Sequence, residues 1–347
     1  MNKLSNIQIS RIVVLSGIVI LIALCFLFAM RVTARAKKTP LSSLTGGETG
    51  KIYYESANFG IGYYQLFSRI PSNDKVVVFG DLKIPKGIKE KVPAIVFVHG
   101  SAGWHRRHKS WLKLFNKMGI ATFRINSFSP RKVTSTIGKQ HILPTSSMIA
   151  DSYNALKLLS THPKIDRERI GIMGWSKGGV AALYSACEPI RQSMVNGDLK
   201  FALHISLYPF CMKLEKIQMT GAPILILIGE KDESTPAKFC TELIKDFKDA
   251  DYDANIIVYP DAHHGFDSYQ DFSYIAKAYR VEDCRIIIKA NGEQIETTTG
   301  ISLRTPEEEI KALTKCGTRG VHLGRNGAAR EKANEDVKKF VTKAFGL

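Results

Sequence analysis

Between residues 75 and 344, short apolar runs alternate with segments whose apolar residues recur at helical spacing. Short apolar or β-branched runs predict strands, and a period of about 3.6 residues predicts helices. Strands that alternate with helices in this way form a mainly parallel central sheet with helices on both faces. We therefore expect an α/β fold. The expected strands span 75–84, 93–99, 120–125, 170–175, 202–207, 224–228 and 255–259, and the expected helices span 111–118, 147–160, 178–186, 237–247 and 328–344.

Residues 12–30 form an uncharged apolar stretch of 19 residues, flanked by Arg11 and Arg31. At about 1.5 Å per residue, a helix of this length reaches about 30 Å and crosses the bilayer core. The small-x-small triplet at 34–36 lies well beyond a long apolar stretch, which favours an uncleaved anchor over a cleaved signal. We expect an N-terminal signal or anchor segment at 1–36, a polar linker at 37–50 and the main domain at 51–347.

The cysteines and the charges that flank the apolar stretch predict different compartments for the main domain. Cys284 and Cys316 bracket a polar segment that contains the Asn291-Gly292 turn signal, and we expect a disulfide there, which requires an oxidising compartment. The positive-inside rule, taken alone, would place the main domain in the cytoplasm. We favour an exported, periplasmic or extracytoplasmic domain. The other cysteines in expected core elements should behave as small buried hydrophobes: Cys187, Cys211 and Cys240.

The chain carries a formal net charge of +17. Such an excess can attract nucleic acid or anionic lipid, but no nucleic-acid motif and no interleaved aromatic stripe accompanies it. We interpret it as a solvated basic surface and expect no nucleic-acid partner. The sequence does not indicate an oligomeric state.

The run GIMGWSKGG at 171–179 joins an expected strand to an expected helix, with Ser176 at the junction. Gly174 and Gly178 flank the serine at two residues on either side. A nucleophile on a sharp strand-to-helix turn needs neighbours without bulky side chains, and Gly-x-Ser-x-Gly meets that need. The context predicts that Ser176 is a nucleophile rather than part of a purely structural turn.

A serine hydroxyl needs a base to take its proton and a carboxylate to orient that base. Asp232 follows the strand 224–228, and the pair His263 and His264 follows the strand 255–259. The carboxyl ends of parallel strands meet at one edge of a sheet, so these side chains can converge on Ser176. The alternative is that Asp232 caps the next helix and that the histidines are ordinary loop residues.

Donors for an oxyanion are expected from two backbone N–H groups. The first belongs to Lys177, at the start of a helix whose dipole helps. The second belongs to the loop 99–103, where Ser101 is the favoured donor and Gly100 and Gly103 permit a close approach. A plain turn is the alternative for this loop.

The stretch 75–266 resembles the dienelactone hydrolase family of α/β-hydrolases. The matching pieces are HGSAG (99–103), NSFSPR (126–131), HPKIDRERIGIMGWSKGG (162–179), GEKDESTP (229–236) and YPDAHHGF (259–266). The resemblance implies an α/β-hydrolase fold, His264 rather than His263 as the base, and Ser101 in the oxyanion loop. Two departures stand out: Ser176 occupies a position where the founding members of the family use cysteine, and residues 268–323 form an insertion before the last helix.

These features predict a serine hydrolase that cleaves an ester, lactone or related acyl bond of a small-molecule substrate through an acyl-enzyme. The chemistry needs no cofactor, and no His, Cys, Asp or Glu cluster has metal-ligand spacing. Lactone specificity does not follow, because of the serine. The alternatives are a membrane-tethered peptidase of the same fold and a catalytically silent binding protein. Residues beside the expected site that could contact substrate are Trp104, Arg131, Trp175 and Phe266.

Overall fold

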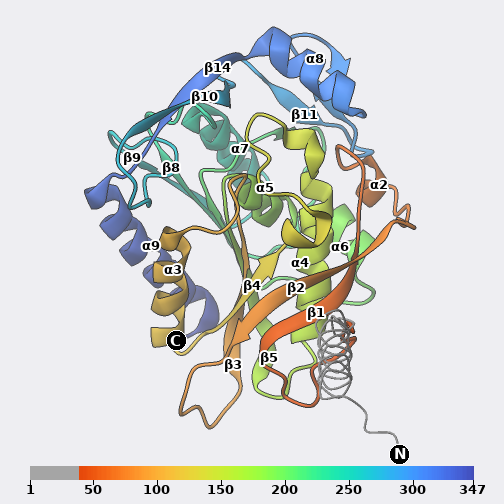
Figure 1. Cartoon of the computed structure of the whole chain (residues 1–347), viewed down its shortest axis with the longest axis vertical. Helices are drawn as coiled ribbons and strands as arrows, with labels where there is room; N and C mark the ends of the chain where they lie inside the picture. Colours follow the sequence, from red (N-terminus) through yellow and green to blue (C-terminus); the bar gives the residue numbers. More distant parts are fainter. Residues whose placement is uncertain (1–38) are drawn as a thin grey trace, which may run out of the picture. The chain divides into compact units, whose positions relative to one another are not determined.

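An eight-stranded sheet forms the centre of the computed structural model, which describes residues 39–347 (Figure 1). The two strands at one edge pair antiparallel, and all neighbours from β4 onward pair parallel. The expected α/β fold with a mainly parallel sheet, of the α/β-hydrolase type, is confirmed. From edge to edge the strands are β1 (Gly50–Ala57), β2 (Lys75–Lys83), β4 (Ala121–Asn126), β3 (Val92–Val98), β5 (Ile165–Trp175), β6 (His204–Leu207), β8 (Ile224–Gly229) and β9 (Ala254–Tyr259).

Helices cover the sheet from both sides. In Figure 1, α3 and α9 lie on the left of the sheet, and α4 and α6 lie on the right. The last helix shows how the pattern produces this packing, because its buried residues recur every four positions along one face. The helices are α2 (Tyr64–Phe67), α3 (Arg106–Lys117), α4 (Thr145–Leu159), α5 (Lys177–Tyr184), α6 (Glu188–Met194), α7 (Ala237–Asp249) and α9 (Gly327–Phe345), with single 3₁₀ turns η1 (Ser129–Arg131) and η2 (Gln140–Ile142).

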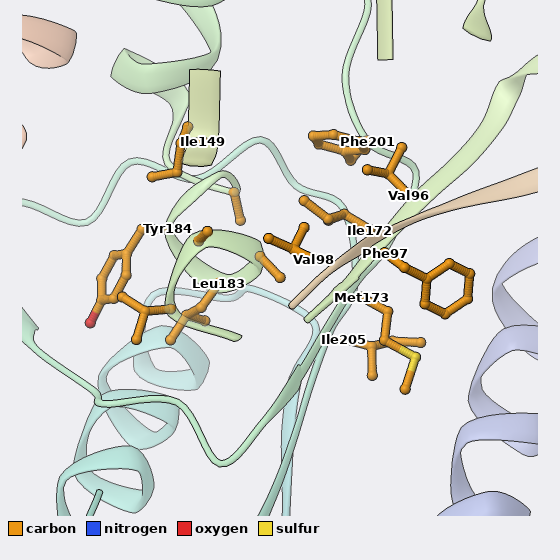
Figure 2. Close-up of a cluster of buried hydrophobic side chains, with 14 of the residues drawn as sticks. Val96, Phe97, Val98, Ile149, Ile172, Met173, Leu183, Tyr184, Phe201 and Ile205 are labelled. Atoms are coloured by element: carbon orange, nitrogen blue, oxygen red, sulfur yellow. The ribbon is translucent and has the colours of Figure 1, made fainter. Parts of the chain in front are cut away.

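The core lies on both faces of the central strands. Every residue of β3 is buried, which explains its continuous apolar run. Figure 2 shows Val96 and Val98 of this strand on one side of the sheet and Phe97 on the other, with Met173 of β5 beside Phe97. Since successive side chains of a strand point to opposite faces, an all-apolar strand needs helices on both sides.

The chain before β1 differs from the expected linker. The side chain of Leu44 is fully buried, and its N–H donates to Thr161 Oγ1 at 2.7 Å. The N–H of Leu41 donates to the carbonyl of Tyr53, also at 2.7 Å. Although the composition of 37–50 is polar, Leu41 and Leu44 pack against the core of the domain. Residues 40–49 therefore belong to the main domain. The apolar stretch 12–30 lies outside the described residues, and within 39–347 no helix is long and apolar enough to cross a membrane.

The insertion at 268–323 folds into two small sheets and a helix. Strand β10 (Ser273–Arg280) pairs antiparallel with β14 (Thr318–Leu323). The disulfide Cys284–Cys316 is present and ties the insertion to the end of its own helix. The expected turn at Asn291-Gly292 connects two of the short strands. The remaining elements are β11 (Ile286–Ile288), β12 (Gln294–Glu296), β13 (Ile301–Ser302), their partner β7 (Lys213–Leu214) and the helix α8 (Pro306–Cys316).

A second disulfide joins Cys211 and Cys240, and the expectation that both are free buried cysteines is therefore wrong. Each is buried, as expected, but the chain between them brings the start of α7 back beside the segment after β6. A separation of 29 residues across a strand and a helix gives no local signal for such a pair. Cys187 is buried and free, as expected.

Candidate active site

Ser176 lies at the junction between β5 and α5 in a conformation that few side chains adopt, with φ of 52° and ψ of −117°. The turn is held by hydrogen bonds on both sides of it. The Ser176 N–H donates to the carbonyl of Leu207 at 2.8 Å, and its carbonyl accepts from the N–H of Val180 at 2.8 Å. A strained backbone of this kind, over-determined by its surroundings, is typical of functional turns.

The two flanking glycines are required by the backbone around them. A Cβ atom at Gly174 would lie 2.0 Å from the carbonyl oxygen of Gly178, and a Cβ at Gly178 would lie 2.2 Å from that of Val98. Neither contact can be relieved by rotating a side chain, because both involve main-chain oxygens. The Gly-x-Ser-x-Gly spacing therefore allows β3, β5 and α5 to approach closely around the serine.

His264 connects Ser176 to Asp232. Its Nε2 lies 3.0 Å from Ser176 Oγ, and its Nδ1 lies 2.8 Å from Asp232 Oδ2. A carboxylate accepts hydrogen bonds only, so Nδ1 carries the proton and Nε2 is left to accept from the serine hydroxyl. The side chain of Asp232 is fully buried, while that of His264 is 12% exposed. The three residues follow β5, β8 and β9, whose carboxyl ends lie at one edge of the sheet.

Thr235, which the sequence analysis missed, fixes the carboxylate. Its N–H donates to Asp232 Oδ1 at 2.8 Å, and its hydroxyl lies 2.9 Å from Asp232 Oδ2 and 3.2 Å from His264 Nδ1. The N–H of Ser234 donates to the same Oδ1 at 2.9 Å. A Ser or Thr three residues after the acid in the loop after β8 is the sequence signal that could have indicated this role.

His263 lies apart from Ser176. Its ring packs against Phe272, with centroids 4.9 Å apart, and its Nδ1 is buried without a hydrogen-bond partner among the described residues. Of the two histidines, it is therefore His264, the one that the family resemblance implies, that lies within hydrogen-bond distance of Ser176.

The loop 99–103 lies against the serine turn. A Cβ atom at Gly100 would stand 2.9 Å from the carbonyl oxygen of Trp175 and 3.4 Å from Ser176 Cβ. Gln140, on η2, connects this loop to the residue after the serine. Its Oε1 accepts from Ser101 Oγ at 3.2 Å and from Lys177 Nζ at 3.1 Å. The two residues expected to supply oxyanion donors are thus joined through one amide, which no sequence motif indicated.

The side chain of Lys177 is buried as well, although the sequence suggested a role for its backbone only. Its ammonium also donates to the carbonyl of Gln140 at 2.8 Å. Burial lowers the pKa of Lys177 to about 8, and the carboxylate of Glu309 on α8 opposes this shift only in part. The pKa of Glu309 is raised by burial, against the charges of Lys177 and His141. The insertion thus contributes a charged group behind the serine turn.

Three of the four expected substrate contacts are buried in the structure. Trp175 and Phe266 are fully buried core residues, and Trp175 Nε1 donates to Asp267. Arg131 forms a two-pronged ion pair with Asp151, with both N–O distances at 2.9 Å, and its side chain is 7% exposed. These three expectations are wrong, because the sequence beside the site does not show which aromatic or cationic side chains the folded chain buries against a partner. Trp104 remains partly exposed, and its Nε1 donates to the carbonyl of Ile125.

The end of the insertion lies directly beside His264. The N–H of Gly324 donates to the carbonyl of His264 at 3.3 Å, where β14 ends. Glu233, next to Asp232, accepts from the N–H of His322 at 2.8 Å and pairs with Arg280 of β10. The insertion is therefore attached to both loops that carry the expected base and acid. Within residues 39–347, no group of three or more His, Cys, Asp or Glu side chains is arranged to hold a metal ion.

The fold and this geometry define the class of the α/β-hydrolases. The family model of the dienelactone hydrolase family matches residues 80–285, more than half of the chain. The chain belongs to the dienelactone hydrolase family and is a hydrolase of the carboxylic ester class. The match ends within the insertion, before most of its strands and its helix.

Two curated proteins are similar to the chain. A Bradyrhizobium protein described as a 2-oxo-3-(5-oxofuran-2-ylidene)propanoate lactonase is 24% identical over 184 residues, which cover 51% of this chain and 74% of that protein. A Yersinia pestis protein described as a carboxymethylenebutenolidase is 33% identical over 118 residues, which cover 33% of this chain and 43% of that protein.

Solved structures include two neighbours. Esterase 2 of Thermogutta terrifontis with bound propionate has a TM-score of 0.44 and 16% identity, covering 58% of this chain and 83% of its own. A dienelactone hydrolase from Klebsiella pneumoniae has a TM-score of 0.45 and 20% identity, covering 62% of this chain and 88% of its own.

Proposed function

We propose that the chain hydrolyses an ester, lactone or related acyl bond of a small molecule by a Ser176–His264–Asp232 triad. The observation that carries the proposal is the continuous relay of 3.0 Å from Ser176 Oγ to His264 Nε2 and 2.8 Å from His264 Nδ1 to Asp232 Oδ2. Such a relay makes an otherwise weak nucleophile reactive, because the base takes its proton as the new bond forms.

In this mechanism His264 Nε2 takes the proton of Ser176 as Oγ attacks the carbonyl carbon. The carbonyl oxygen becomes an oxyanion, stabilised by the N–H groups of Lys177 and Ser101. The intermediate collapses, the alcohol leaves with the proton from Nε2, and the acyl group stays on Oγ. Water then attacks the acyl-enzyme with His264 again as base, the bond between the acyl carbon and Ser176 Oγ breaks, and Oγ takes the proton back from Nε2 as the carboxylic acid leaves. Asp232 holds the imidazole in the required tautomer and stabilises its charged form.

The substrate class rests on family membership. Two similar proteins are described as acting on lactones, and lactones are cyclic esters with the same acyl bond. Because Ser176 is the nucleophile here, we include open-chain esters in the proposal. A peptidase of the same fold and a silent binding protein are the competing functions. The relay argues against a silent protein, since burying the Asp232 carboxylate costs free energy that a binding role does not require.

The proposal is tested with Ser176→Ala in the full chain, assayed on p-nitrophenyl acetate, simple lactones and a peptide panel. We expect kcat on the ester or lactone to fall by at least about 10⁴-fold, because the nucleophile is removed; any residual rate comes from groups that still stabilise the transition state. Ser42→Ala, at an exposed serine, is the matched control and should keep full activity.

Labelling by a fluorophosphonate separates the alternatives, because only an activated serine reacts readily. Label on the wild type that disappears in Ser176→Ala supports the proposal. Unlabelled wild-type protein would favour the silent binding domain, and turnover confined to peptides would favour the peptidase.

A further inference from the structure

A buried carboxylate that the proposed reaction does not use lies three residues after His264. Asp267 is 1% exposed. Its Oδ2 accepts from Trp111 Nε1 at 2.9 Å and from Trp175 Nε1 at 3.0 Å, and its Oδ1 accepts from the hydroxyl of Tyr208 at 2.7 Å. Four separate parts of the chain, α3, β5, the segment after β6 and the loop after β9, therefore meet at one carboxylate.

A carboxylate at this depth requires compensation. Besides its three donors, Asp267 forms an ion pair with Arg107, whose Nε lies 3.8 Å from Oδ1. Burial opposes the charge of Arg107, but the pKa of its guanidinium is raised above the ordinary value, with the negative charge of Asp267 among the causes. Well-packed apolar side chains of similar size often replace a buried ion pair without loss of stability. Stability alone is therefore a weak reason for a charged group here.

Two of the three donors lie next to proposed catalytic residues. Trp175 immediately precedes Ser176, and its indole is held between Asp267 and the ring of Phe97, with ring centroids 5.9 Å apart. Ser176 has a strained φ of 52° and shares a peptide bond with Trp175, so a shift of Trp175 would move the serine backbone and Oγ with it. The hydrogen bond from the indole to Asp267 helps to hold Trp175 in place.

Tyr208 makes the corresponding link to the base. Its ring packs edge-on against His264, with centroids 4.7 Å apart, and its carbonyl accepts from the hydroxyl of Thr235 at 3.1 Å. Burial first, and then the negative charge of Asp267, raise the pKa of Tyr208 well above its ordinary value, so the hydroxyl stays protonated and donates. Tyr208 thus supports the imidazole on one side and the acid loop on the other.

We propose that Asp267 is a positioning residue for hydrolysis: through Trp175 and Tyr208 it holds Ser176 and His264 at reacting distance. The inference rests on the proposed function. Asp267 does not touch the reacting atoms, so its removal misaligns the triad without removing any member of it. Misplacing catalytic groups by about 1 Å can lower a rate by about 100-fold.

The test compares two single-atom changes in the full chain. Tyr208→Phe removes the hydroxyl that binds Asp267 and keeps the ring against His264. Tyr153→Phe removes an equally buried hydroxyl, which donates to the carbonyl of Ser185, at the end of α5 opposite to Ser176. We expect Tyr208→Phe to lower kcat on p-nitrophenyl acetate, and the rate of fluorophosphonate labelling, by about tenfold or more, with KM changed less than about twofold. Tyr153→Phe should keep both rates.

Asp267→Asn is the second variant, and Ser176→Ala is the reference that separates this proposal from the proposed function. Asp267→Asn should lower kcat further than Tyr208→Phe, because it disturbs both links at once; if it does not fold, the tyrosine pair still decides. Wild-type kcat and labelling in Tyr208→Phe, alongside an inactive Ser176→Ala, would overturn the role of Asp267 and leave the proposed function standing. An equal loss of kcat in Tyr153→Phe would overturn it too, since the effect would then be general destabilisation. Full activity in Ser176→Ala would instead reject the proposed function.

Discussion

Ser176 and Lys177 are neighbours in sequence, but the folded chain strains the backbone of the first and buries the side chain of the second. The backbone of Ser176 is forced into an unfavourable conformation, which costs about 1–3 kcal/mol and exposes the hydroxyl. The ammonium of Lys177 is instead buried next to an amide rather than a carboxylate, with Gln140 as its hydrogen-bond partner. Burying a cation this way also lowers stability. Both costs fall within two residues at the centre of the proposed site.

The lowered pKa of Lys177 predicts how stability depends on pH. Between about 8, its pKa in the folded chain, and its ordinary value of 10.5, the unfolded chain binds the proton and the folded chain does not. The free energy of unfolding therefore rises with pH across that window. Below the window, where Lys177 is protonated in both states, the gain is absent. At about 1.4 kcal/mol per pH unit, the difference amounts to roughly 3 kcal/mol. Urea unfolding of the full chain at pH 7 to 10.5 measures the slope.

Lys177→Met should remove this rise, since no proton is then bound at the position in either state. Lys113→Met, at an exposed lysine on α3, is the control and should keep the slope of the wild type. Glu309, whose pKa is raised by burial, faces the same space, so its own titration at lower pH must be separated by confining the comparison to pH above 7. Parallel slopes for the wild type and Lys177→Met would contradict the prediction.

The junction of β5 and α5 predicts a sharp difference between two glycines. A Cβ at Gly174 would meet the carbonyl oxygen of Gly178 at 2.0 Å, whereas one at Gly327, at the start of α9, meets no atom within 4 Å. Gly174→Ala should therefore push α5 away from β5 and abolish ester hydrolysis, with a loss of several kcal/mol in stability. Gly327→Ala should leave kcat unchanged and match or exceed wild-type stability. Activity and urea titrations of both variants test this, and a fully active Gly174→Ala would contradict it.

The strands and helices of the sheet could be predicted because each carries its own pattern. The continuous apolar run of 93–99 became β3, and the four-residue stripe of the last helix became α9. Ser176, Asp232 and the pair His263 and His264 could be named for a related reason, since position at the end of a strand is itself a sequence property, whereas the choice of His264 came from the family resemblance. The geometry that joins them is consistent with that prediction.

Contacts between distant segments could not be predicted. Arg131 was expected to be free to contact substrate because Asp151, its partner on α4, lies 20 residues away without any motif to link them. Cys211 and Cys240 fit a buried hydrophobe as well as a disulfide. Gln140 and Asp267 lie in segments without a recognisable sequence pattern, so only the folded chain shows which groups they contact. The missed residues are thus those whose role depends on a contact with a distant segment of the chain rather than on the helix, strand or loop to which they belong.

Across the molecule, the insertion and the sheet meet at the proposed site. Strand β14 ends beside His264, and α8 brings Glu309 behind Lys177. Two disulfides, Cys211–Cys240 and Cys284–Cys316, reinforce this side of the domain. Because thiols stay reduced in most cytosols, we propose that the domain works in an oxidising compartment outside the cytoplasm. Mass spectrometry of the full chain after alkylation, with and without reduction, tests whether the two pairs are formed.

The disulfide Cys284–Cys316 predicts a measurable contribution to stability. It closes a loop over a sequence separation of 32 residues, and loop-closure entropy alone assigns such a crosslink roughly 3–4 kcal/mol. Replacing both cysteines by serine should lower the urea midpoint and open the insertion to proteolysis between β10 and β14. Activity should fall as well, because the end of β14 is bonded to the backbone of His264.

Reductant supplies the control for this variant. In the wild type, dithiothreitol breaks both disulfides, whereas in the serine variant only Cys211–Cys240 remains to be broken. If the two crosslinks act independently, dithiothreitol lowers the midpoint of the variant by less than that of the wild type, and the two reduced proteins converge. Equal midpoints for the oxidised proteins, with equal sensitivity to dithiothreitol, would mean that Cys284–Cys316 does not hold the insertion against the site.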